Sequence, residues 1–379
     1  MASSLDTARE RLRRFAEHEA ADASPLYSHL AAEAATDDEV AGLLTAASGD
    51  DADPALLLAA AHRLVQAEPI HPLSRYYPSL GGLDGPDSQT WPLFRDFVLE
   101  RADRVRELVS TRATRTDEVR RAAVLYPAVA GVAKRARGPV GLLEVGCGAG
   151  LLLGMDTFSY RYQRDGGEQL VAGPAKAVVG LHCSLAVADG AVFPALPKKL
   201  AVKARVGLDR HPVDAADEDE LAWLEACVWA DQPDRIRLLR TAAGAQRRWQ
   251  PELFAGDAVG DLATAAGRVP DELPLVVFTD GVLGSLPAER REDFVAALGE
   301  IAAHRPLSWV AVEYSGDSGD SGLAAWLNLV APDAAAPAAA TGQAVLGVVA
   351  FEDGRARGEL LASAEPQGQR MTWLAGSAG

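Results

Sequence analysis

Hydrophobic positions recur at helical spacing in the first third of the chain. Leu5, Ala8, Leu12 and Phe15 lie three or four residues apart with charged residues between them, which predicts an amphipathic helix. Similar patterns predict helices at residues 37–47, 54–67 and 91–108, and a further helix from Thr116. Residues 1–137 are therefore expected to form a helical N-terminal domain that acts as a lid.

After Gly138 the pattern changes to short apolar runs that alternate with helical stretches, which is typical of βαβ units and a mainly parallel sheet. The expected strands are residues 140–145, 204–208, 250–255, 275–279 and 309–313. A last pair of runs, 344–352 and 358–364, is joined across Asp353 and Gly354, a step that favours a tight turn, and 370–374 would complete the edge. The fold class expected for residues 138–379 is α/β, a Rossmann-like, mainly parallel sheet with an antiparallel edge hairpin.

Charge and composition exclude several classes of partner. The 379 residues carry a formal charge of −16, which repels phosphate backbones and anionic lipid, so nucleic-acid and membrane partners are not expected. The three cysteines are dispersed and indicate reduced thiols. The N-terminus lacks the apolar region of a secretory signal, and the Ala-rich run 331–350 is interrupted by Pro332, Asp333 and Pro337. A cytoplasmic location is expected.

The strongest local motif is a glycine-rich turn. An apolar strand ends at Glu144 and Val145 and runs into Gly146, Gly148 and Gly150. Glycines allow a sharp turn and a close approach of the backbone to a ligand, and a helix after the turn would offer N–H groups to a carboxylate or phosphate. A structural turn without a ligand is an equally good interpretation of the motif alone.

Acidic residues follow the ends of several later strands. Asp209 ends the second strand, Asp257 follows the third and Asp280 ends the fourth. Open α/β sheets bind ligands at the carboxyl ends of their strands, and a carboxylate there can accept both hydroxyls of a ribose.

This series of motifs resembles class I methyltransferases. The resemblance covers residues 138–375 and implies S-adenosylmethionine as cofactor. By position, Glu144 and the glycines at 146, 148 and 150 would hold its methionine part, Asp209 its ribose, and Asp257 would lie near its adenine, with Asp280 on the same edge. The acid after the second strand follows the glycine turn at well over twice the usual distance, which predicts an inserted segment at residues 155–203 that closes the cofactor pocket or occupies it.

Over nearly its whole length the chain resembles an uncharacterised bacterial family, domain of unknown function 2332. The matching landmarks include Ser24-Pro25-Leu26-Tyr27, His71-Pro72-Leu73, Tyr160-Arg161-Tyr162 and Gly207-Leu208-Asp209. The chain departs from the family pattern after the glycine turn and at residues 115–118, which suggests a specialised role, for example in secondary metabolism such as antibiotic biosynthesis.

Candidate catalytic residues lie outside the sheet. His71, Asp84, Asp117 and Glu118 are the candidate bases, and Arg75, Tyr76, Tyr77, Tyr160 and Arg161 are the candidate substrate-binding residues. Each has a structural alternative. Asp84 beside glycine is common turn chemistry, Asp117 and Glu118 favour a helix start, and His71 before a proline is more often structural. The histidines are too dispersed to predict a metal site.

Three interpretations of function remain open. The first is an S-adenosylmethionine-dependent methyltransferase acting on a small molecule. The second is an enzyme that keeps the fold without the cofactor, in which Asp84 deprotonates an amine for intramolecular displacement, elimination or ring closure. The third is a non-catalytic subunit of a hetero-oligomer. A protein partner or a homo-oligomer is compatible with each of them.

Overall fold

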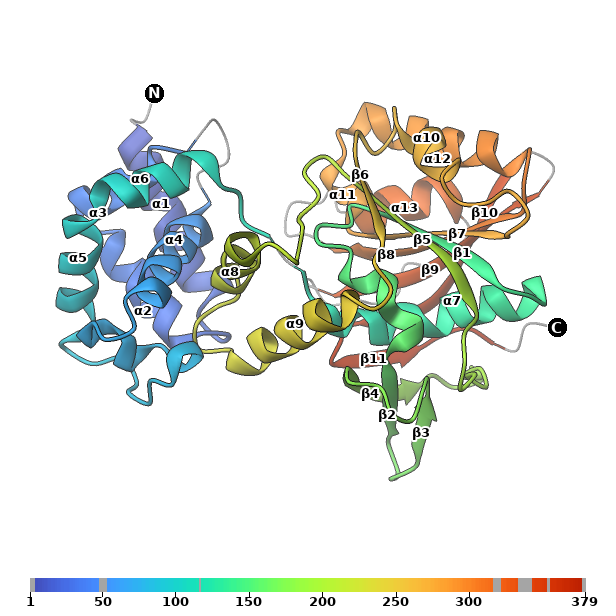
Figure 1. Ribbon diagram of the computed structural model, residues 1–379, viewed down its shortest axis with the longest axis horizontal. Coiled ribbons are helices and arrows are strands. Elements are labelled where there is room, and N and C mark those ends of the chain that lie inside the picture. Colours follow the sequence, from blue (N-terminus) through green and yellow to red (C-terminus); the bar gives the residue numbers. More distant parts are fainter. Residues whose placement is uncertain are drawn as a thin grey trace. The chain divides into compact units, whose positions relative to one another are not determined.

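The computed structural model describes residues 4–47, 53–115, 117–315, 322–332, 343–352 and 355–376 (Figure 1). They form two compact units, the first bounded as Met1–Asp117 with Ala215–Arg240 and the second as Glu118–Asp214 with Thr241–Gly379. Residues 118–137, which the sequence pattern groups with the helical part, lie in the second unit. Residues 215–240 lie in the first.

The first unit is helical, and several of its helices begin at a capping side chain followed by proline. The side-chain oxygens of Ser24 and Asp53 accept backbone N–H groups of the following turn, and Pro25 and Pro54 occupy the first helical positions. Its helices and helical turns are α1 (Ser4–Arg14), η1 (Phe15–Glu19), α2 (Pro25–Ala34), α3 (Asp38–Leu44), α4 (Pro54–Ala67), η3 (Pro72–Tyr76), η4 (Pro78–Leu80), α5 (Thr90–Glu100), α6 (Ala102–Thr111), α8 (Glu218–Cys227) and the first part of α9 (Pro233–Gln246). The single helix expected over 91–108 is divided at Arg101.

The core of the first unit explains why it includes residues 215–240. Trp223 and Ala230 are buried in the same apolar cluster as the side chains of α1 to α6. The Trp223 indole also donates a hydrogen bond to the carbonyl oxygen of Ala113, at 3.0 Å. This apolar burial holds the later segment to the N-terminal helices.

His62 makes the stability of the first unit pH-dependent. Its ring is fully buried on α4, with Nδ1 3.1 Å from the Ala226 carbonyl and Nε2 2.8 Å from Ser79 Oγ. Burial lowers the pKa of His62 from 6.5 to about 4. Between these pH values the unfolded chain binds a proton that the folded unit does not, so stability falls as the pH decreases. We expect a loss of about 3 kcal/mol across this window.

The stability of the first unit is measured by denaturant unfolding at several pH values, with amide hydrogen exchange in α4 as the readout. The His62→Gln variant retains a donor and an acceptor and should lose this part of the pH dependence. The control His18→Gln removes an exposed imidazole from the same unit and should retain it. An unchanged pH slope in His62→Gln would contradict the assignment.

The second unit is built on one sheet of eleven strands in the order β3-β2-β4-β11-β10-β9-β8-β7-β1-β5-β6. Neighbours β6, β5, β1, β7 and β8 are parallel, and β9 and β10 continue the sheet in antiparallel fashion. The strands are β1 (Val140–Val145), β2 (Ser159–Arg164), β3 (Gln169–Ala172), β4 (Gly180–Val187), β5 (Val202–Asp209), β6 (Glu252–Ala255), β7 (Leu275–Asp280), β8 (Leu307–Tyr314), β9 (Ala344–Glu352), β10 (Arg355–Ala364) and β11 (Arg370–Trp373). This arrangement confirms the expected Rossmann-like α/β fold.

The antiparallel hairpin is formed by β9 and β10, and the Asp353-Gly354 step between them lies outside the described residues. Residues 370–374 were expected to complete the edge of the sheet. The strand is confirmed as β11, but its position at the edge is wrong, because β11 lies between β10 and β4.

The strands of the inserted segment 155–203 extend the sheet. Its strands β2, β3 and β4 pair with one another, and β4 pairs with β11 at the end of the sheet far from β5 and β6. Alternate side chains of β2 are buried: Tyr160 stacks on Tyr126 of α7 at 4.2 Å between ring centroids, and the Tyr162 hydroxyl donates to the Ala123 carbonyl. Strands β2 to β4 therefore lie several strands away from the glycine turn, and the closing or filling of the cofactor pocket by this segment stays a prediction.

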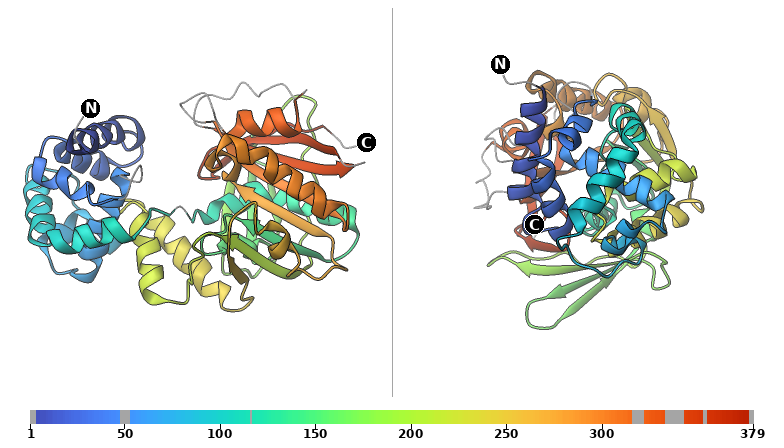
Figure 2. Two further views of the ribbon diagram at one scale, coloured as in Figure 1. Left: turned by 90° about the horizontal axis from the view of Figure 1, so that it is seen from above. Right: turned by 90° about the vertical axis from the view of Figure 1, so that its left-hand side faces the viewer.

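Helices cover both faces of the sheet (Figures 1 and 2). One face is covered by α10 to α13, whose side chains share an apolar core with Leu143, Val277 and Trp309. The other is covered by α7, which contacts β8, β9 and β4. The helical elements of this unit are η5 (Val119–Arg121), α7 (Ala122–Ala136), η6 (Leu151–Thr157), the end of α9, α10 (Leu262–Ala266), α11 (Val282–Ser285), α12 (Ala288–Ala302) and α13 (Gly322–Val330). Within the described ranges, no helix combines the length and the apolar character needed to cross a bilayer.

Candidate functional site

The carboxyl ends of the central strands meet at one level of the sheet. Val145 of β1 pairs with Leu208 of β5 on one side and with Thr279 of β7 on the other. The next residues along these strands are therefore Gly146, Asp209 and Asp280, side by side at the same edge. After the strands of the inserted segment, the chain forms β5 and β6 on one side of β1, and it then forms β7 and β8 on the other side. This reversal of strand order is the point where open α/β sheets bind ligands.

The glycine turn after β1 has the backbone that the motif predicts. Gly146, Gly148 and Gly150 have φ values of 75°, 52° and 66°, in the left-handed region that side chains disfavour. The Gly146 N–H donates to the Leu208 carbonyl at 2.8 Å, which fixes the turn to β5. At Gly150 an added Cβ would lie 2.8 Å from Leu253 Cδ2. Both conformation and space therefore require glycine here.

The element after the turn differs from the expected ligand-binding helix. Residues Leu151–Thr157 form a short 3₁₀ helix, and its residues Leu151 to Met155 are buried. The Gln246 side chain donates to the Ala149 carbonyl at 2.6 Å, so a protein group already lies against the turn. Because β2 begins at Ser159, the chain has no room for a long helix.

Asp209 supports the glycine turn directly. Its carboxylate oxygens accept the N–H groups of Gly148 and His211, each at 2.9 Å. A carboxylate has about four acceptor sites, so these bonds are compatible with additional donors such as ribose hydroxyls. They also mean that replacing Asp209 would perturb the turn itself.

Asp257 is engaged by an arginine of α12. Its carboxylate oxygens lie 2.6 and 2.8 Å from the guanidinium nitrogens of Arg290, and Oδ1 also accepts the N–H groups of Val259 and Gly260. Hydrogen bonding to Arg290, with the two backbone N–H groups, holds the pKa of Asp257 well below its usual range. The Asp257 side chain therefore organises its own loop, and the role near adenine implied by the resemblance has no support in its contacts.

Asp280 belongs to a buried charged cluster that also contains Arg121 and Tyr314. Arg121 Nη1 lies 2.5 Å from Asp280 Oδ2, and both side chains are mostly buried. The Tyr314 hydroxyl donates to Asp280 Oδ1, and the Arg121 guanidinium lies 5.0 Å from the Tyr314 ring centroid. Burial opposes charge on Arg121, but the Asp280 carboxylate outweighs it, so the pKa of Arg121 lies above its ordinary value.

Glu313, at the carboxyl end of β8, is a candidate that sequence reasoning did not select. Its side chain is 2 % exposed, and its oxygens accept the N–H groups of Leu283 at 3.1 Å and Gly284 at 3.3 Å. Burial raises the pKa of Glu313 from 4.5 to about 8, with the nearby Asp280 acting in the same direction. The available signal was an acid at the end of the expected strand 309–313. Nothing in the sequence indicated Arg121 or Arg290, which approach from helical elements.

Glu144 lies inside the sheet rather than on its rim. It is 4 % exposed and pairs in register with Gly207 of β5 and Phe278 of β7. Alternation along β1 places its side chain on the face opposite Leu143, which belongs to the core beneath α10 to α13.

The other second-unit candidates lie away from the strand ends. Tyr160 and Arg161 are on β2 at the far end of the sheet order, with Tyr160 buried and Arg161 exposed. The Tyr160 hydroxyl donates to the Met155 carbonyl at 2.5 Å. Glu118 caps η5 by accepting the Arg120 N–H at 3.1 Å, in line with the helix-start alternative. Thr116, where that helix was expected to begin, lies outside the described residues.

The remaining candidates belong to the first unit and have local structural partners. His71 caps η3 through Nδ1, which accepts the Leu73 N–H at 3.2 Å. Asp84 lies 3.3 Å from Arg75 Nε, with both side chains about half exposed. The buried Tyr76 hydroxyl donates to Asp87 at 2.7 Å.

Two further first-unit residues complete the set. Tyr77 is buried against His62, with 5.4 Å between ring centroids. Asp117 is the last residue of the first unit's N-terminal segment. In the part of the chain that the structure describes, no group of three or more His, Cys, Asp or Glu residues could hold a metal ion.

Comparisons with known proteins give a family and distant structural neighbours. The family model described as "Uncharacterized protein conserved in bacteria (DUF2332)" matches residues 9–373. The crystal structure of Streptomyces venezuelae DesVI is 15% identical, with 65% of this chain and 72% of that chain covered and a TM-score of 0.24. That of a S-adenosylmethionine-dependent methyltransferase from Clostridium acetobutylicum ATCC 824 is 9% identical, with 64% and 75% covered and a TM-score of 0.24. No curated protein matches the chain.

Proposed function

Since the chain belongs to the bacterial family DUF2332, whose name carries no reaction, we propose from the site itself that it is a small-molecule-modifying enzyme of the S-adenosylmethionine-dependent methyltransferase type. The observation that carries this proposal is the coincidence of a left-handed glycine turn with the point where the strand order reverses. Asp209 stands beside that turn at the same level of the sheet.

The residues at the turn fit a nucleoside cofactor in part. The glycines at 146 and 148 allow the backbone to approach a ligand closely, and Asp209 can accept ribose hydroxyls while it supports the turn. Gly150 is packed against Leu253, and Asp257 is bound to Arg290. The residues that fit the cofactor are therefore those at the carboxyl ends of β1 and β5.

Methyl transfer requires few catalytic groups from the protein. The cofactor, when bound, supplies an electrophilic methyl group for an in-line displacement. The protein then aligns the substrate and accepts a proton from its nucleophile. Asp84, His71, Asp117 and Glu118 remain the proposed bases. Of these, Asp84 is paired with Arg75.

The test is calorimetric titration of the full chain with S-adenosylmethionine and with its demethylated product. We expect micromolar binding, near −8 kcal/mol as an order of magnitude. The Asp209→Asn variant keeps the shape of the side chain and should weaken binding by about tenfold or more. Because Asp209 also supports the turn, each variant's thermal unfolding is measured in parallel.

The matched control is Asp217→Asn. Asp217 belongs to the first unit and likewise accepts two backbone N–H groups, those of Asp219 and Glu220. It should leave the affinity unchanged while costing comparable stability. Absence of binding to folded wild-type protein would overturn the proposal.

A second function is favoured by the ion pairs of the carboxylates that follow β6 and end β7. Asp257 and Asp280 are each committed to an arginine, which suits a site that has kept the fold without the cofactor. In that case an amine deprotonated by Asp84 would displace a leaving group within the same molecule. No cofactor binding, together with activity lost in Asp84→Asn, would support this function. Intact biological function in both the Asp209→Asn and the Asp84→Asn variants would point to a non-catalytic subunit.

A further inference from the structure

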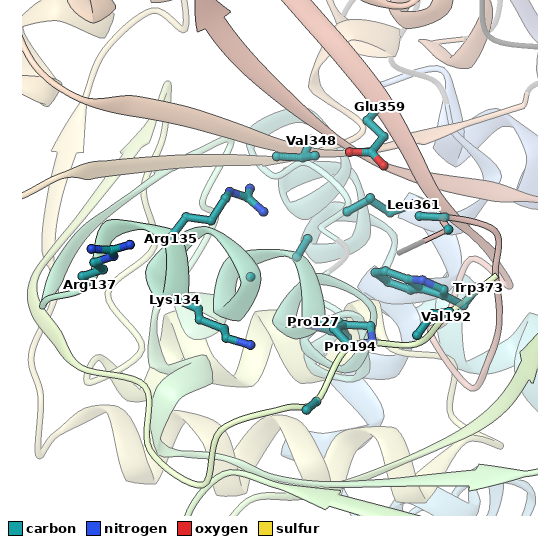
Figure 3. A pocket seen from close by; sticks show the side chains of 15 residues that line it. Pro127, Lys134, Arg135, Arg137, Val192, Pro194, Val348, Glu359, Leu361 and Trp373 are labelled. Atoms are coloured by element: carbon teal, nitrogen blue, oxygen red, sulfur yellow. The ribbon is translucent and has the colours of Figure 1, made fainter. Parts of the chain in front are cut away.

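A cavity of about 660 Å³ lies within the second unit, beneath α7 (Figure 3). Its wall comes from α7, from the loop around Pro194, and from β9, β10 and β11. None of these segments contributes to the carboxyl edge of β1, β5 and β7, so the cavity is separate from the site described above. Its volume is in the range of small-molecule pockets.

One part of the wall is cationic. Lys134 and Arg135 occupy the last turn of α7, and Arg137 follows it. All three are exposed, and within the described residues none of them forms an ion pair. Glu359 of β10 is the one carboxylate among the lining residues. On a chain with a formal charge of −16, this excess of positive charge marks a place for an anion.

The helix dipole explains only part of this arrangement. Cations stabilise the last turn of a helix, which accounts for Lys134 and Arg135. Arg137, however, has a φ of 55°, a left-handed conformation that glycine adopts without cost, and Gly138 is the next residue. Neither the helix dipole nor the backbone conformation therefore accounts for an arginine at position 137.

The rest of the wall is apolar and contains an unsatisfied donor. Val348, Leu361 and Trp373 line it and are at least nine-tenths buried. The indole packs edge-on against Phe193, with ring centroids 5.1 Å apart, and its Nε1–H has no acceptor among the described residues. A buried N–H without a partner is unfavourable, so an oxygen brought by a ligand would satisfy it. Figure 3 shows Trp373 across the cavity from Lys134 and Arg135.

We propose that this cavity binds an amphipathic carboxylate. The carboxylate lies at the cationic end of the cavity, which Lys134 and Arg135 border. The apolar body lies along Val348 and Leu361, and an oxygen on that body accepts the Trp373 N–H. Charge attraction selects an acid over its ester, and the indole selects an oxygen-bearing chain over a plain one. The site does not depend on the cofactor proposed above.

The test titrates the full chain with ω-hydroxydecanoate, decanoate and the methyl ester of ω-hydroxydecanoate. We expect the acid to bind at least about tenfold more tightly than the ester, and ω-hydroxydecanoate more tightly than decanoate. The double variant Lys134→Gln/Arg135→Gln should lose about tenfold in affinity for both acids. The control Arg247→Gln/Arg248→Gln removes the same charge from exposed positions outside the lining and should bind as wild type.

Trp373→Phe keeps the ring and removes the N–H. It should abolish the preference for ω-hydroxydecanoate over decanoate while leaving the discrimination against the ester. Equal binding of acid and ester, unchanged affinity in the double variant, or no binding of either acid would overturn the proposal. Because no cofactor is added, these outcomes are independent of whether S-adenosylmethionine binds.

Discussion

Replacing Arg121 with Met is expected to lower the unfolding free energy of the second unit by about 3–5 kcal/mol. Arg121 is the cationic partner of Asp280 at the end of β7, and both side chains are mostly buried. Without the guanidinium, the Asp280 carboxylate would keep the hydrogen bond from the Tyr314 hydroxyl but would lose its cationic partner in a poorly solvated site. A buried charge that has lost its counter-ion costs far more than an exposed ion pair contributes.

The double variant Arg121→Met/Asp280→Asn separates this cost from the loss of packing. If the uncompensated carboxylate is responsible, removing it should recover most of the stability lost in the single variant, and a double-mutant cycle should give a large coupling energy. Urea denaturation of the full chain, followed by hydrogen exchange in β7, measures both. Additive effects of the two substitutions would show that the ion pair is not the source.

Glu313 should make the second unit less stable as the pH rises. Its pKa is raised by burial from 4.5 to about 8, so between these values the folded unit holds a proton that the unfolded chain has released. Stability from this source is fully present below pH 4.5 and is lost as the pH rises through 8. The total change has an upper limit of about 5 kcal/mol.

Glu313→Gln removes the titrating group and should flatten this part of the stability profile. The measurement compares the unfolding free energies of the two proteins at several pH values from about 5 to about 8. This range lies between the unfolded and folded pKa values of Glu313. Glu300→Gln, which removes an exposed carboxylate from α12, is the control and should retain the wild-type slope. A Glu313→Gln profile parallel to that of wild type would contradict the assignment. The sign is opposite to that expected for His62 in the first unit, so the two units should respond to acid in opposite directions.

The central strands could be predicted because each is a short apolar run between turn residues. The expected strand 140–145 coincides with β1, and 204–208 and 275–279 lie within β5 and β7. The glycine turn was also predictable, since three glycines in alternation after a buried strand have few other uses. Their left-handed backbone and the close contact of Gly150 with Leu253 confirm that use.

What the sequence could not provide is the set of partners brought together by tertiary folding. Arg121 and Asp280 are 159 residues apart, and Asp257 meets Arg290 from a separate helix. These pairs decide whether an acid on the rim faces a ligand or the protein itself. Local pattern also could not show that β2 to β4 join the far end of the sheet, because strand pairing of this kind depends on contacts distant in sequence.

The two outermost strands of the sheet, β3 and β6, are only four residues long each. A short outer strand exposes few unpaired backbone groups, and natural proteins use this to resist edge-to-edge aggregation. The second unit should therefore stay dispersed at high concentration despite its wide sheet. Any protein that does associate with it would have to recognise side chains on the helical faces, since neither border offers enough backbone to template an additional strand.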